Sequence, residues 1–214
     1  MTPPACPVCR SAEVGAFVCV QDSRYWRCGR CAATFLDPAQ RPRPAAELAH
    51  YRRHRNDPAD PGYRRFLARL ADPLLGKLAP GSAILDYGCG PGPALPRMLE
   101  EAGHRVSLFD PFFRPDATPL GTRYDAVTCT EVAEHFHEPA EEFDRLALLL
   151  KPGGWLALMT CWQTDDARFA NWHYRRDPTH VVFFRSSTLV HLARSRGWSI
   201  ELPVKDVALM RLPP

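Results

Sequence analysis

The sequence predicts an α/β protein in which a small metal-dependent module precedes a doubly wound sheet. Three features indicate this fold: two pairs of closely spaced cysteines before residue 40, a buried strand that runs into a glycine turn near residue 88, and a closing pair of strands after residue 198. A chain of 214 residues can bury one sizeable core with a small appendage, but not two full domains. We divide it into residues 1–40, 41–79 and 80–214.

The composition narrows the class of protein. With 45% hydrophobic and 24% charged residues, the chain is typical of a folded protein and not of a disordered one. No apolar stretch reaches the roughly 20 residues that span a bilayer, and the first residues lack the basic and apolar regions of a secretory signal. We therefore expect a cytoplasmic protein without a membrane partner, whose eight cysteines are thiols or metal ligands and not disulfides.

Residues 1–40 carry a four-cysteine pattern, with two C-x2-C pairs eighteen residues apart: Cys6 and Cys9, then Cys28 and Cys31. The intervening residues 14–27 favour a short hairpin that brings the pairs together. Four thiolates satisfy tetrahedral Zn²⁺ with no open position, which predicts a structural zinc ribbon. About forty residues cannot build a self-sufficient core, so the metal would supply much of the folding free energy. We expect the other cysteines to be small buried thiols: Cys19, Cys89, Cys129 and Cys161.

Residues 41–79 read as an arginine-rich helical linker, with helices expected over 45–54 and 61–78. Residues 24–69 hold eleven arginines against four carboxylates. Such a segment either binds phosphate, RNA or an acidic substrate, or forms a solvated helix face, and the sequence leaves both open. His50 and His54 lie four residues apart without the glutamate of a metalloprotease pattern, so we expect them on the surface.

Residues 80–110 form a Rossmann-like start. A short apolar strand over 82–87 is followed at once by a glycine turn containing Gly88, Gly90 and Gly92, and then by a helix over 94–102. A second strand, 106–109, ends in Asp110, where a carboxylate can accept hydrogen bonds from ribose hydroxyls. Position 93 is proline, so the G-x-G-x-x-G pattern of dinucleotide-binding proteins is not met.

Three phrases in order carry a resemblance to a known family. Residues 85–92 (LDYGCGPG) resemble the first motif of the class I S-adenosylmethionine-dependent methyltransferases. Residues 124–135 (YDAVTCTEVAEH) are similar to the fourth strand and E-V-x-E-H phrase of quinone-pathway and related methyltransferases, and residues 150–156 (LKPGGWL) to the turn before the fifth strand. The resemblance covers about residues 80–214 and does not specify a substrate.

The resemblance implies S-adenosylmethionine as the cofactor. Asp86 and the glycine turn would line its methionine moiety, with Asp86 facing the ammonium group. Asp110 would hold the ribose hydroxyls, and Pro111 or Phe112 would lie against the adenine. The residues that would face cofactor and acceptor after the fourth strand are Thr130 and Glu131.

One segment departs from the family pattern. Only thirteen residues separate Asp110 from Tyr124, where the family normally fits a helix, a third strand and another crossover. A crossover with its helix alone takes at least about ten to twelve residues. We therefore expect the third strand to be missing or reduced to a loop, with Asp116 as the only acidic candidate for an adenine contact.

Residues 172–180 are rich in histidine, aromatic and acidic residues and follow the fifth strand, where the resemblance implies the acceptor site. Two histidines, His135 and His180, join Glu131 as catalytic candidates because imidazole titrates near neutral pH. A purely structural role is the alternative for each histidine: His135 would pack at a helix start near Glu131 or Glu134, and His180 would form a hydrogen-bonded pair with Asp177. We expect His137 to be exposed. A metal site formed by His173, Asp177 and His180 is a minor alternative.

Three functions follow from these motifs. The first is methyl transfer from S-adenosylmethionine to an oxygen, nitrogen or carbon atom of a small organic acceptor. The second is RNA methylation, in which the zinc module and the arginine-rich segment would bind RNA. The third is a non-catalytic zinc-ribbon adaptor with a degenerate methyltransferase fold. The shortened third-strand region supports this hypothesis.

Overall fold

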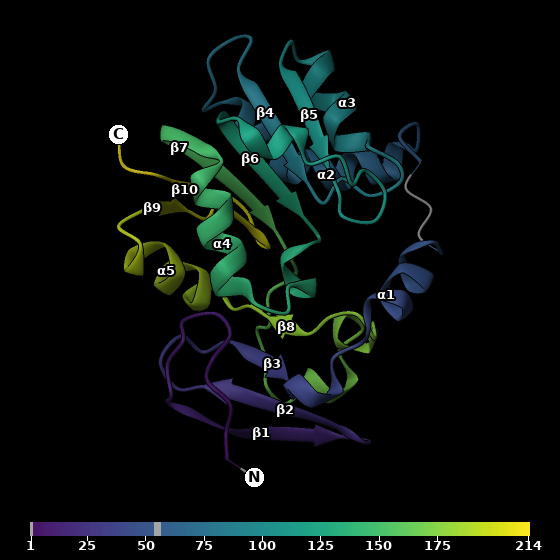
Figure 1. The fold of residues 1–214 in the computed structure, drawn as a ribbon, viewed down its shortest axis with the longest axis vertical. Coiled ribbons are helices and arrows are strands. Elements are labelled where there is room, and N and C mark those ends of the chain that lie inside the picture. The colour runs from purple at the N-terminus through teal and green to yellow at the C-terminus, as the bar shows by residue number, and fades with distance from the viewer. Residues whose placement is uncertain (1, 54–56) are drawn as a thin grey trace.

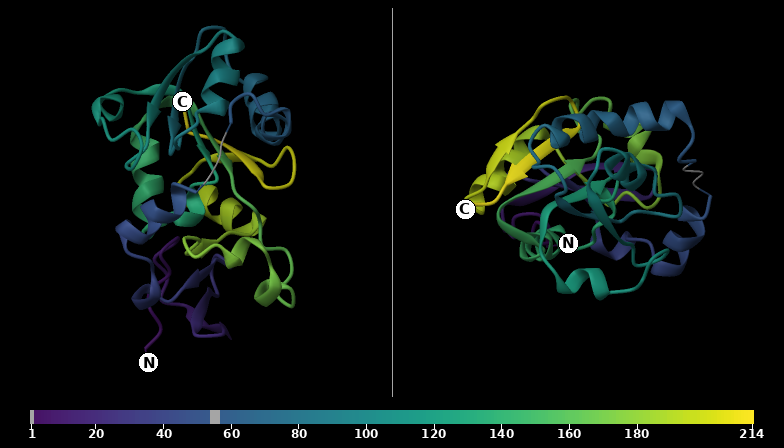
Figure 2. Two further views of the ribbon diagram at one scale, coloured as in Figure 1. Left: turned by 90° about the vertical axis from the view of Figure 1, so that its right-hand side faces the viewer. Right: turned by 90° about the horizontal axis from the view of Figure 1, so that it is seen from above.

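The computed structural model describes residues 2–53 and 57–214, and it consists of two sheets stacked along the long axis of the molecule (Figures 1 and 2). The smaller sheet contains the N-terminal strands, and the larger one contains the strands that follow residue 80. His54 lies outside the described residues. Among those that are described, no helix is long and apolar enough to cross a membrane.

The small sheet has the strand order β1-β2-β3-β8. Three strands come from the N-terminal module: β1 (Val14–Val20), β2 (Ser23–Cys28) and β3 (Thr34–Leu36). The fourth, β8 (Val182–Phe183), pairs antiparallel with β3. Sequence analysis missed this pairing, because a two-residue strand 146 positions beyond β3 carries no periodic signal. The zinc-ribbon-like module is thus joined to the segment that follows β7 (Leu150–Met159) of the large sheet.

The helices that lie between the two sheets in the sequence begin at prolines. A 3-10 turn, η1 (Pro38–Gln40), leads to α1 (Pro44–Tyr51), and α2 (Pro61–Leu75) follows. Proline is favoured in the first helical turn because its missing N–H has no partner there anyway. Asp60 caps α2 by accepting hydrogen bonds from two backbone N–H groups. The second helix is three residues shorter than expected.

The large sheet has the order β5-β4-β6-β7-β10-β9, in which β5, β4, β6 and β7 run parallel and the last two strands are antiparallel. This confirms the predicted doubly wound sheet. Its strands are β4 (Ala83–Tyr87), β5 (Arg105–Phe109), β6 (Tyr124–Thr130), β7 (Leu150–Met159), β9 (Ser199–Glu201) and β10 (Val207–Arg211). The helices are α3 (Ala94–Glu101), α4 (Pro139–Leu148) and α5 (Ser186–Ser195).

The third strand of the family pattern is missing, as the short spacing predicts. Residues 111–123 form a tight turn closed by a bridge between Asp110 and Arg114, followed by the 3-10 turn η2 (Thr118–Gly121). As a result β5 is an edge strand of the sheet.

Adjacent strand residues bury opposite faces of the sheet, as alternation in a strand requires. Ile84 belongs to a core shared with α2 and α3, whereas Leu85 belongs to a core shared with α4 and α5. Figure 1 shows α4 in front of the sheet and α2 behind it. Both faces are therefore covered, which is the condition for a stable parallel sheet.

The N-terminal module also contacts the domain of the large sheet directly, through helix α4. The backbone N–H of Ala140, at the start of α4, donates to the carbonyl of Pro7 at 2.9 Å. Two of the buried cysteines, Cys6 and Cys31, belong to the same hydrophobic core as Phe143 of α4. The module thus shares a core with the domain that it precedes.

Candidate active site

A cavity of about 1170 Å³ opens at the carboxyl ends of β4, β5 and β6. This is the edge at which open α/β sheets bind ligands. It exceeds the roughly 300–1,000 Å³ typical of a pocket for one small ligand, and so has room for a nucleoside-sized cofactor and a second molecule. It contains every predicted cofactor and catalytic residue: Asp86, Gly88, Gly90, Gly92, Asp110, Pro111, Phe112, Thr130, Glu131, His135 and His180.

The glycine turn is built for close approach. Gly88 and Gly90 have φ angles of +80° and +64°, which favour glycine. A Cβ atom on Gly88 would lie 2.5 Å from Cγ2 of Val132. The turn after β4 therefore touches the turn after β6, and no other residue fits at position 88 without moving one of them.

Asp86 lies at the end of β4 and is almost completely buried. Its Oδ1 accepts a hydrogen bond of 2.6 Å from the hydroxyl of Thr128. Burial raises the pKa of Asp86 to about 6, and the nearby charge of Asp110 adds to the effect. A buried carboxylate with one hydrogen-bond partner gains most from a cation, and an ammonium group is such a partner.

Asp110 connects the turn after β4 to the turn after β5 through hydrogen bonds. Its Oδ2 accepts from the N–H of Gly90 at 2.9 Å, and its Oδ1 accepts from the N–H groups of Phe112 and Phe113 at 2.8 and 3.0 Å. A carboxylate offers about four acceptor positions, so one remains for a hydroxyl group. The structure thus shows a scaffolding role that the sequence did not reveal.

The turn after β6 carries the strained part of the site. Glu131 has a φ of +53°, unusual for a residue other than glycine, and strain of this kind collects at functional sites. Burial, followed by the charge of Glu134, raises the pKa of Glu131 to about 9. The hydroxyl of the preceding Thr130 is buried without a hydrogen-bond partner among the described residues.

Two histidines and a glutamate meet beside this turn. Nδ1 of His135 lies 3.0 Å from the carbonyl of Thr179, and Nδ1 of His180 lies 2.7 Å from the carbonyl of Tyr174. The two rings are 4.7 Å apart between centroids, and Glu134 is fully buried next to them. Both histidines were predicted as catalytic candidates from the sequence. Glu134 was not, because it entered only as a packing neighbour of His135.

Helix α1 closes one side of the cavity, which sequence analysis did not foresee. Tyr51 packs against the ring of His135, with 5.2 Å between centroids. Glu47 accepts a hydrogen bond of 2.9 Å from Nε2 of His137, whose side chain is about one-third exposed, so the expectation of an exposed His137 is wrong. The expectation for His50 is also wrong: this half-buried residue pairs with Asp177 at 2.9 Å.

The minor alternative of a metal site from His173, Asp177 and His180 is not supported by the geometry. His173 is exposed, and Asp177 is held by the backbone and hydroxyl of Thr179. The acidic candidate in the shortened region also lies away from the site. Asp116 is exposed, accepts two hydrogen bonds from Thr118 and does not line the cavity.

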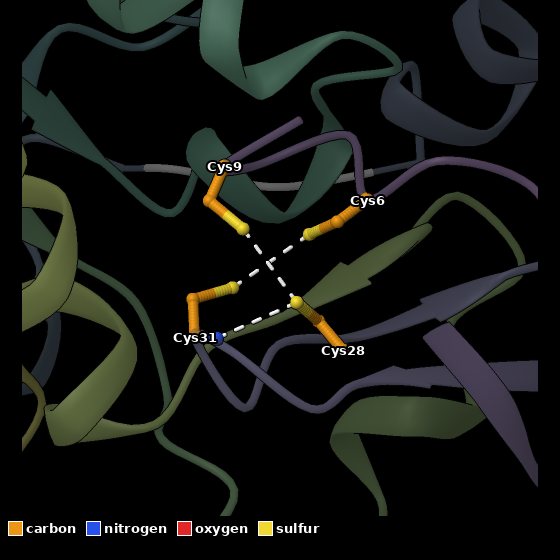
Figure 3. Close-up of side chains that lie close together, drawn as sticks. All are labelled: Cys6, Cys9, Cys28 and Cys31. Atoms are coloured by element: carbon orange, nitrogen blue, oxygen red, sulfur yellow. Dashed lines mark hydrogen bonds between the residues drawn. The ribbon is translucent and has the colours of Figure 1, made fainter. Parts of the chain in front are cut away.

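The four N-terminal cysteines converge on one point outside this cavity. Figure 3 shows their side chains pointing toward one another, and the Sγ atoms of Cys6 and Cys31 are 3.6 Å apart, those of Cys9 and Cys28 3.5 Å. Sulfur atoms 2.3 Å from a tetrahedral zinc ion would be about 3.8 Å apart, so the spacing fits the ion. None of the four forms a disulfide.

The remaining cysteines differ from expectation in one case. Cys89 and Cys129 are buried and Cys161 is partly buried. Cys19 is exposed, so its predicted burial is wrong. It lies on β1, the edge strand of the small sheet.

The fold and the site define a class of protein: a Rossmann-like enzyme with a cavity at the switch point of its sheet that is large enough for a nucleoside and a second small molecule. Residues 34–202 match the family described as "Methyltransferase domain". The chain belongs to this family and is a class I S-adenosylmethionine-dependent methyltransferase. Such a cofactor fits this cavity, because the buried Asp86 carboxyl group, whose pKa is raised to about 6, and the Thr130 hydroxyl, which has no hydrogen-bond partner among the described residues, lie beside a glycine turn.

Similar proteins include the ubiquinone biosynthesis O-methyltransferase of Nitrosomonas europaea, which is 28% identical over 186 residues, covering 71% of this chain and 79% of the relative. The corresponding protein of Nitrosospira multiformis is 29% identical over 180 residues, covering 69% and 72%.

Among solved structures, the 1,6-didemethyltoxoflavin-N1-methyltransferase of Burkholderia thailandensis, with S-adenosylhomocysteine bound, has a TM-score of 0.53 at 16% identity, covering 93% of this chain and 99% of that one. The magnesium protoporphyrin IX methyltransferase of Synechocystis PCC 6803 has a TM-score of 0.50 at 18% identity, covering 71% and 83%. These likenesses concern the fold.

Proposed function

We propose that this protein transfers the methyl group of S-adenosylmethionine to a hydroxyl oxygen of a small organic acceptor. The observation that carries the proposal is the pair of His135 and His180, whose bare ring nitrogens share the cavity of the cofactor-binding turns. A hydroxyl is a poor nucleophile until its proton is removed or loosened, and these nitrogens can accept that proton. The O-methyltransferase names of the two relatives agree with an oxygen acceptor.

Each predicted cofactor residue has a role in this proposal. Asp86 faces the ammonium group of the methionine moiety, and the backbone of Gly88, Gly90 and Gly92 allows close approach. The free acceptor position of Asp110 receives a ribose hydroxyl, with Pro111 and Phe112 against the adenine and Thr130 beside the sulfonium end. The cofactor supplies an electrophilic methyl group, so the chain must align the acceptor and exclude water.

Glu131 and the two histidines form the acceptor side of the proposed site. Glu131 is held at a strained backbone position between the cofactor turn and the acceptor compartment. With its pKa raised to about 9, it carries a proton at neutral pH and donates a hydrogen bond to the acceptor. We further propose that the cysteine cluster holds a structural Zn²⁺ ion and that residues 1–40 depend on it.

The proposal favours a small acceptor over RNA, because arginines of the basic segment are occupied by carboxylates. Arg24 pairs with Asp37, Arg41 with Glu138 and Arg64 with Glu101. Helix α1 also lines the cavity, through Glu47 and Tyr51. We propose no second function.

The test is a methyl-transfer assay with S-adenosylmethionine and two matched panels, phenols and catechols against the corresponding anilines, read by mass spectrometry. We expect methyl ethers from hydroxyl acceptors, and at least a tenfold lower kcat in Glu131→Met, whose side chain cannot donate a hydrogen bond, with unchanged cofactor affinity. Arg168→Gln, a change at an exposed residue outside the cavity, is the control. Methylation of anilines alone would overturn the oxygen assignment.

A further inference from the structure

We propose that Arg41 binds a carboxylate group of the acceptor, so that the substrate is a hydroxy acid. This deepens the proposed function and rests on it. Arg41 lies between η1 and α1 and lines the cavity that contains the cofactor-binding turns. Its side chain is about nine-tenths buried, with 10% of its surface exposed.

One edge of the Arg41 guanidinium group is occupied and the other is free. Nη1 donates a hydrogen bond of 2.8 Å to Oε1 of Glu138. Nε is buried without a hydrogen-bond partner among residues 2–53 and 57–214, and Nη2 donates no hydrogen bond to these residues either. In a guanidinium group, Nε–H and one N–H of Nη2 point in the same direction, and together they match the two oxygens of a carboxylate. The free edge is therefore the one that can hold a carboxylate with two hydrogen bonds.

The ion pair with Glu138 does not explain why this edge is buried. Arginine stays charged and can only donate, so each buried N–H group without an acceptor lowers stability. Glu138 is 58% exposed, and an ion pair with such an exposed partner contributes little to stability. A carboxylate that enters the cavity would compensate the buried charge and would accept from the unused donors.

Neighbouring carboxylates of the cavity wall are engaged with other partners. Glu47 accepts a hydrogen bond of 2.9 Å from His137, and Glu142 accepts one of 2.7 Å from Tyr87. These groups also disfavour additional negative charge. A carboxylate brings one negative charge to this wall, whereas a phosphate group would bring close to two. The wall therefore favours a carboxylate over a phosphate.

Contacts along residues 41–51 show where Arg41 lies relative to the proposed proton acceptors. This segment meets the turn after β6 in reverse order, in the pairs Arg41–Glu138, Glu47–His137 and Tyr51–His135. Glu138 and His135 are three residues apart, so their Cα atoms are separated by at most about 11 Å. A small acceptor that contacts both His135 and Arg41 therefore carries its hydroxyl and its carboxylate at opposite ends.

The experiment measures acceptor binding by calorimetry, with the full chain saturated with S-adenosylhomocysteine. The probes are 4-hydroxyphenylacetate, its neutral amide and 4-hydroxybenzylphosphonate, which differ in the charge of one end. We expect the carboxylate to bind at least about tenfold more tightly than either of the others. In Arg41→Met this advantage should disappear while the affinity for the amide stays within about twofold, because methionine fills similar space without a charge.

Two further variants separate carboxylate binding from a structural role of the ion pair. Glu138→Gln removes the carboxylate that competes for the guanidinium group, so the acid should bind up to about fivefold more tightly. Arg43→Gln, a change at an exposed arginine that also lines the cavity, is the control and should leave every affinity within about twofold. If Arg41→Met fails to fold by thermal unfolding, Arg41→Lys replaces it, because lysine keeps the charge without the planar fork.

The assignment of Arg41 is overturned if the carboxylate binds no more tightly than the amide, or if its advantage survives in Arg41→Met. Equal weakening in Arg41→Met and Glu138→Gln would also overturn it, because the ion pair would then serve only the fold. Tighter binding of the phosphonate would overturn the choice of a carboxylate.

Methyl transfer to 4-hydroxyphenylacetate and 4-aminophenylacetate tests the proposed function separately. Methylation of the amine alone, with a preference for the acid that depends on Arg41, would refute the oxygen acceptor and retain the carboxylate site. Equal methylation of the hydroxyl group in the acid and in its amide would retain the proposed function and refute the carboxylate site.

Discussion

The molecule gathers metal-type ligands at two places, and the two differ in what surrounds them. The four cysteines of the N-terminal module surround one point on all sides, and three of them are buried (Figure 3). The cluster of Glu134, His135 and His180 has only three ligands and lies on a cavity wall. A closed set of four ligands is typical of structural metal sites, whereas three ligands with an open side are typical of chemical ones.

From this difference we expect the N-terminal module to contribute mainly to stability and the cavity edge to contribute mainly to function. The module has a small sheet and shares its core with α4, so a metal there supports the fold. The cavity edge instead holds features that lower stability, such as a buried Asp86, a strained Glu131 and a buried orphan oxygen on Thr130. Substitutions in the first region should mainly lower the melting temperature, and those in the second should mainly lower binding and turnover.

The largest expected effect is loss of stability in Cys28→Ser. The sulfur atom of Cys28 is one of four ligands, and structural zinc contributes on the order of 10 kcal/mol to the folding of such modules. In a chain of this size, 1 kcal/mol shifts the melting temperature by about 2–4 °C. We expect a decrease of about 10 °C or more in thermal unfolding, together with loss of zinc by elemental analysis.

Cys19→Ser is the matched control, because Cys19 is exposed and outside the cluster. It should melt within about 2 °C of the natural protein. If the Cys28→Ser protein kept the melting temperature of the natural protein, the four-cysteine cluster would not be a source of stability, and the proposed difference between the two clusters would be wrong.

The two regions also differ in how well the sequence predicted them. The cysteine spacing and the strand–glycine–helix pattern are local signals, so the module, the sheet and its missing third strand could be predicted. The pairing of β8 with β3 and the placement of α1 over the cavity depend on contacts between distant segments, and no local pattern encodes them.

The same limit applies within the site. Asp86 and His180 could be predicted as cavity residues because they fall at the ends of strands or in a motif. Glu134 entered only as a packing neighbour of His135, because its hydrogen bond with Tyr174, forty residues later, leaves no local pattern in the sequence. A pairing of this kind becomes visible only in three dimensions.

An intermediate effect is expected for Gly88→Ala, compared with Gly103→Ala. Both glycines have similar positive φ angles, +80° and +87°, so both substitutions carry a similar backbone strain of about 1–2 kcal/mol. The Cβ atom at position 88 would additionally meet Val132 at 2.5 Å, whereas position 103 has open space. We expect cofactor affinity to fall on the order of 100-fold in Gly88→Ala alone, because Val132 and the acceptor turn must move.

Calorimetry with S-adenosylmethionine measures that affinity, and thermal unfolding shows whether the two variants are equally destabilised. Equal loss of affinity in both would mean that the turn after β4 tolerates a side chain and that strain alone is responsible. If both variants kept the cofactor affinity of the natural protein, the contact between Gly88 and Val132 would not matter for binding. The turn after β4 and the turn after β6 would then act independently of each other.

The smallest expected effect is a pH dependence of cofactor affinity caused by Asp86. Its folded pKa of about 6 lies above the ordinary value of about 3.9, so the folded protein binds this proton more tightly than the unfolded chain. In the cofactor-free protein, the stability from this group is present below pH 4 and is lost as the pH rises through 6. The ammonium group of the cofactor keeps its proton across this range and prefers the charged carboxylate. Affinity should therefore fall by up to about tenfold between pH 6 and pH 5.

Calorimetry at pH 5, 6 and 7 checks this slope in the natural protein, in Asp86→Asn and in Asp116→Asn. The first variant should bind more weakly and lose the slope, because amide side chains do not titrate in this range. The second should keep both the affinity and the slope, since Asp116 is exposed and lies outside the cavity. A slope that survives in Asp86→Asn would assign the titration to another group and would remove Asp86 from the ammonium site. Tighter binding at pH 5 would mean that the cofactor prefers the neutral carboxyl group of Asp86. The burial of a charged Asp86 would then lower the stability of the protein without improving cofactor binding.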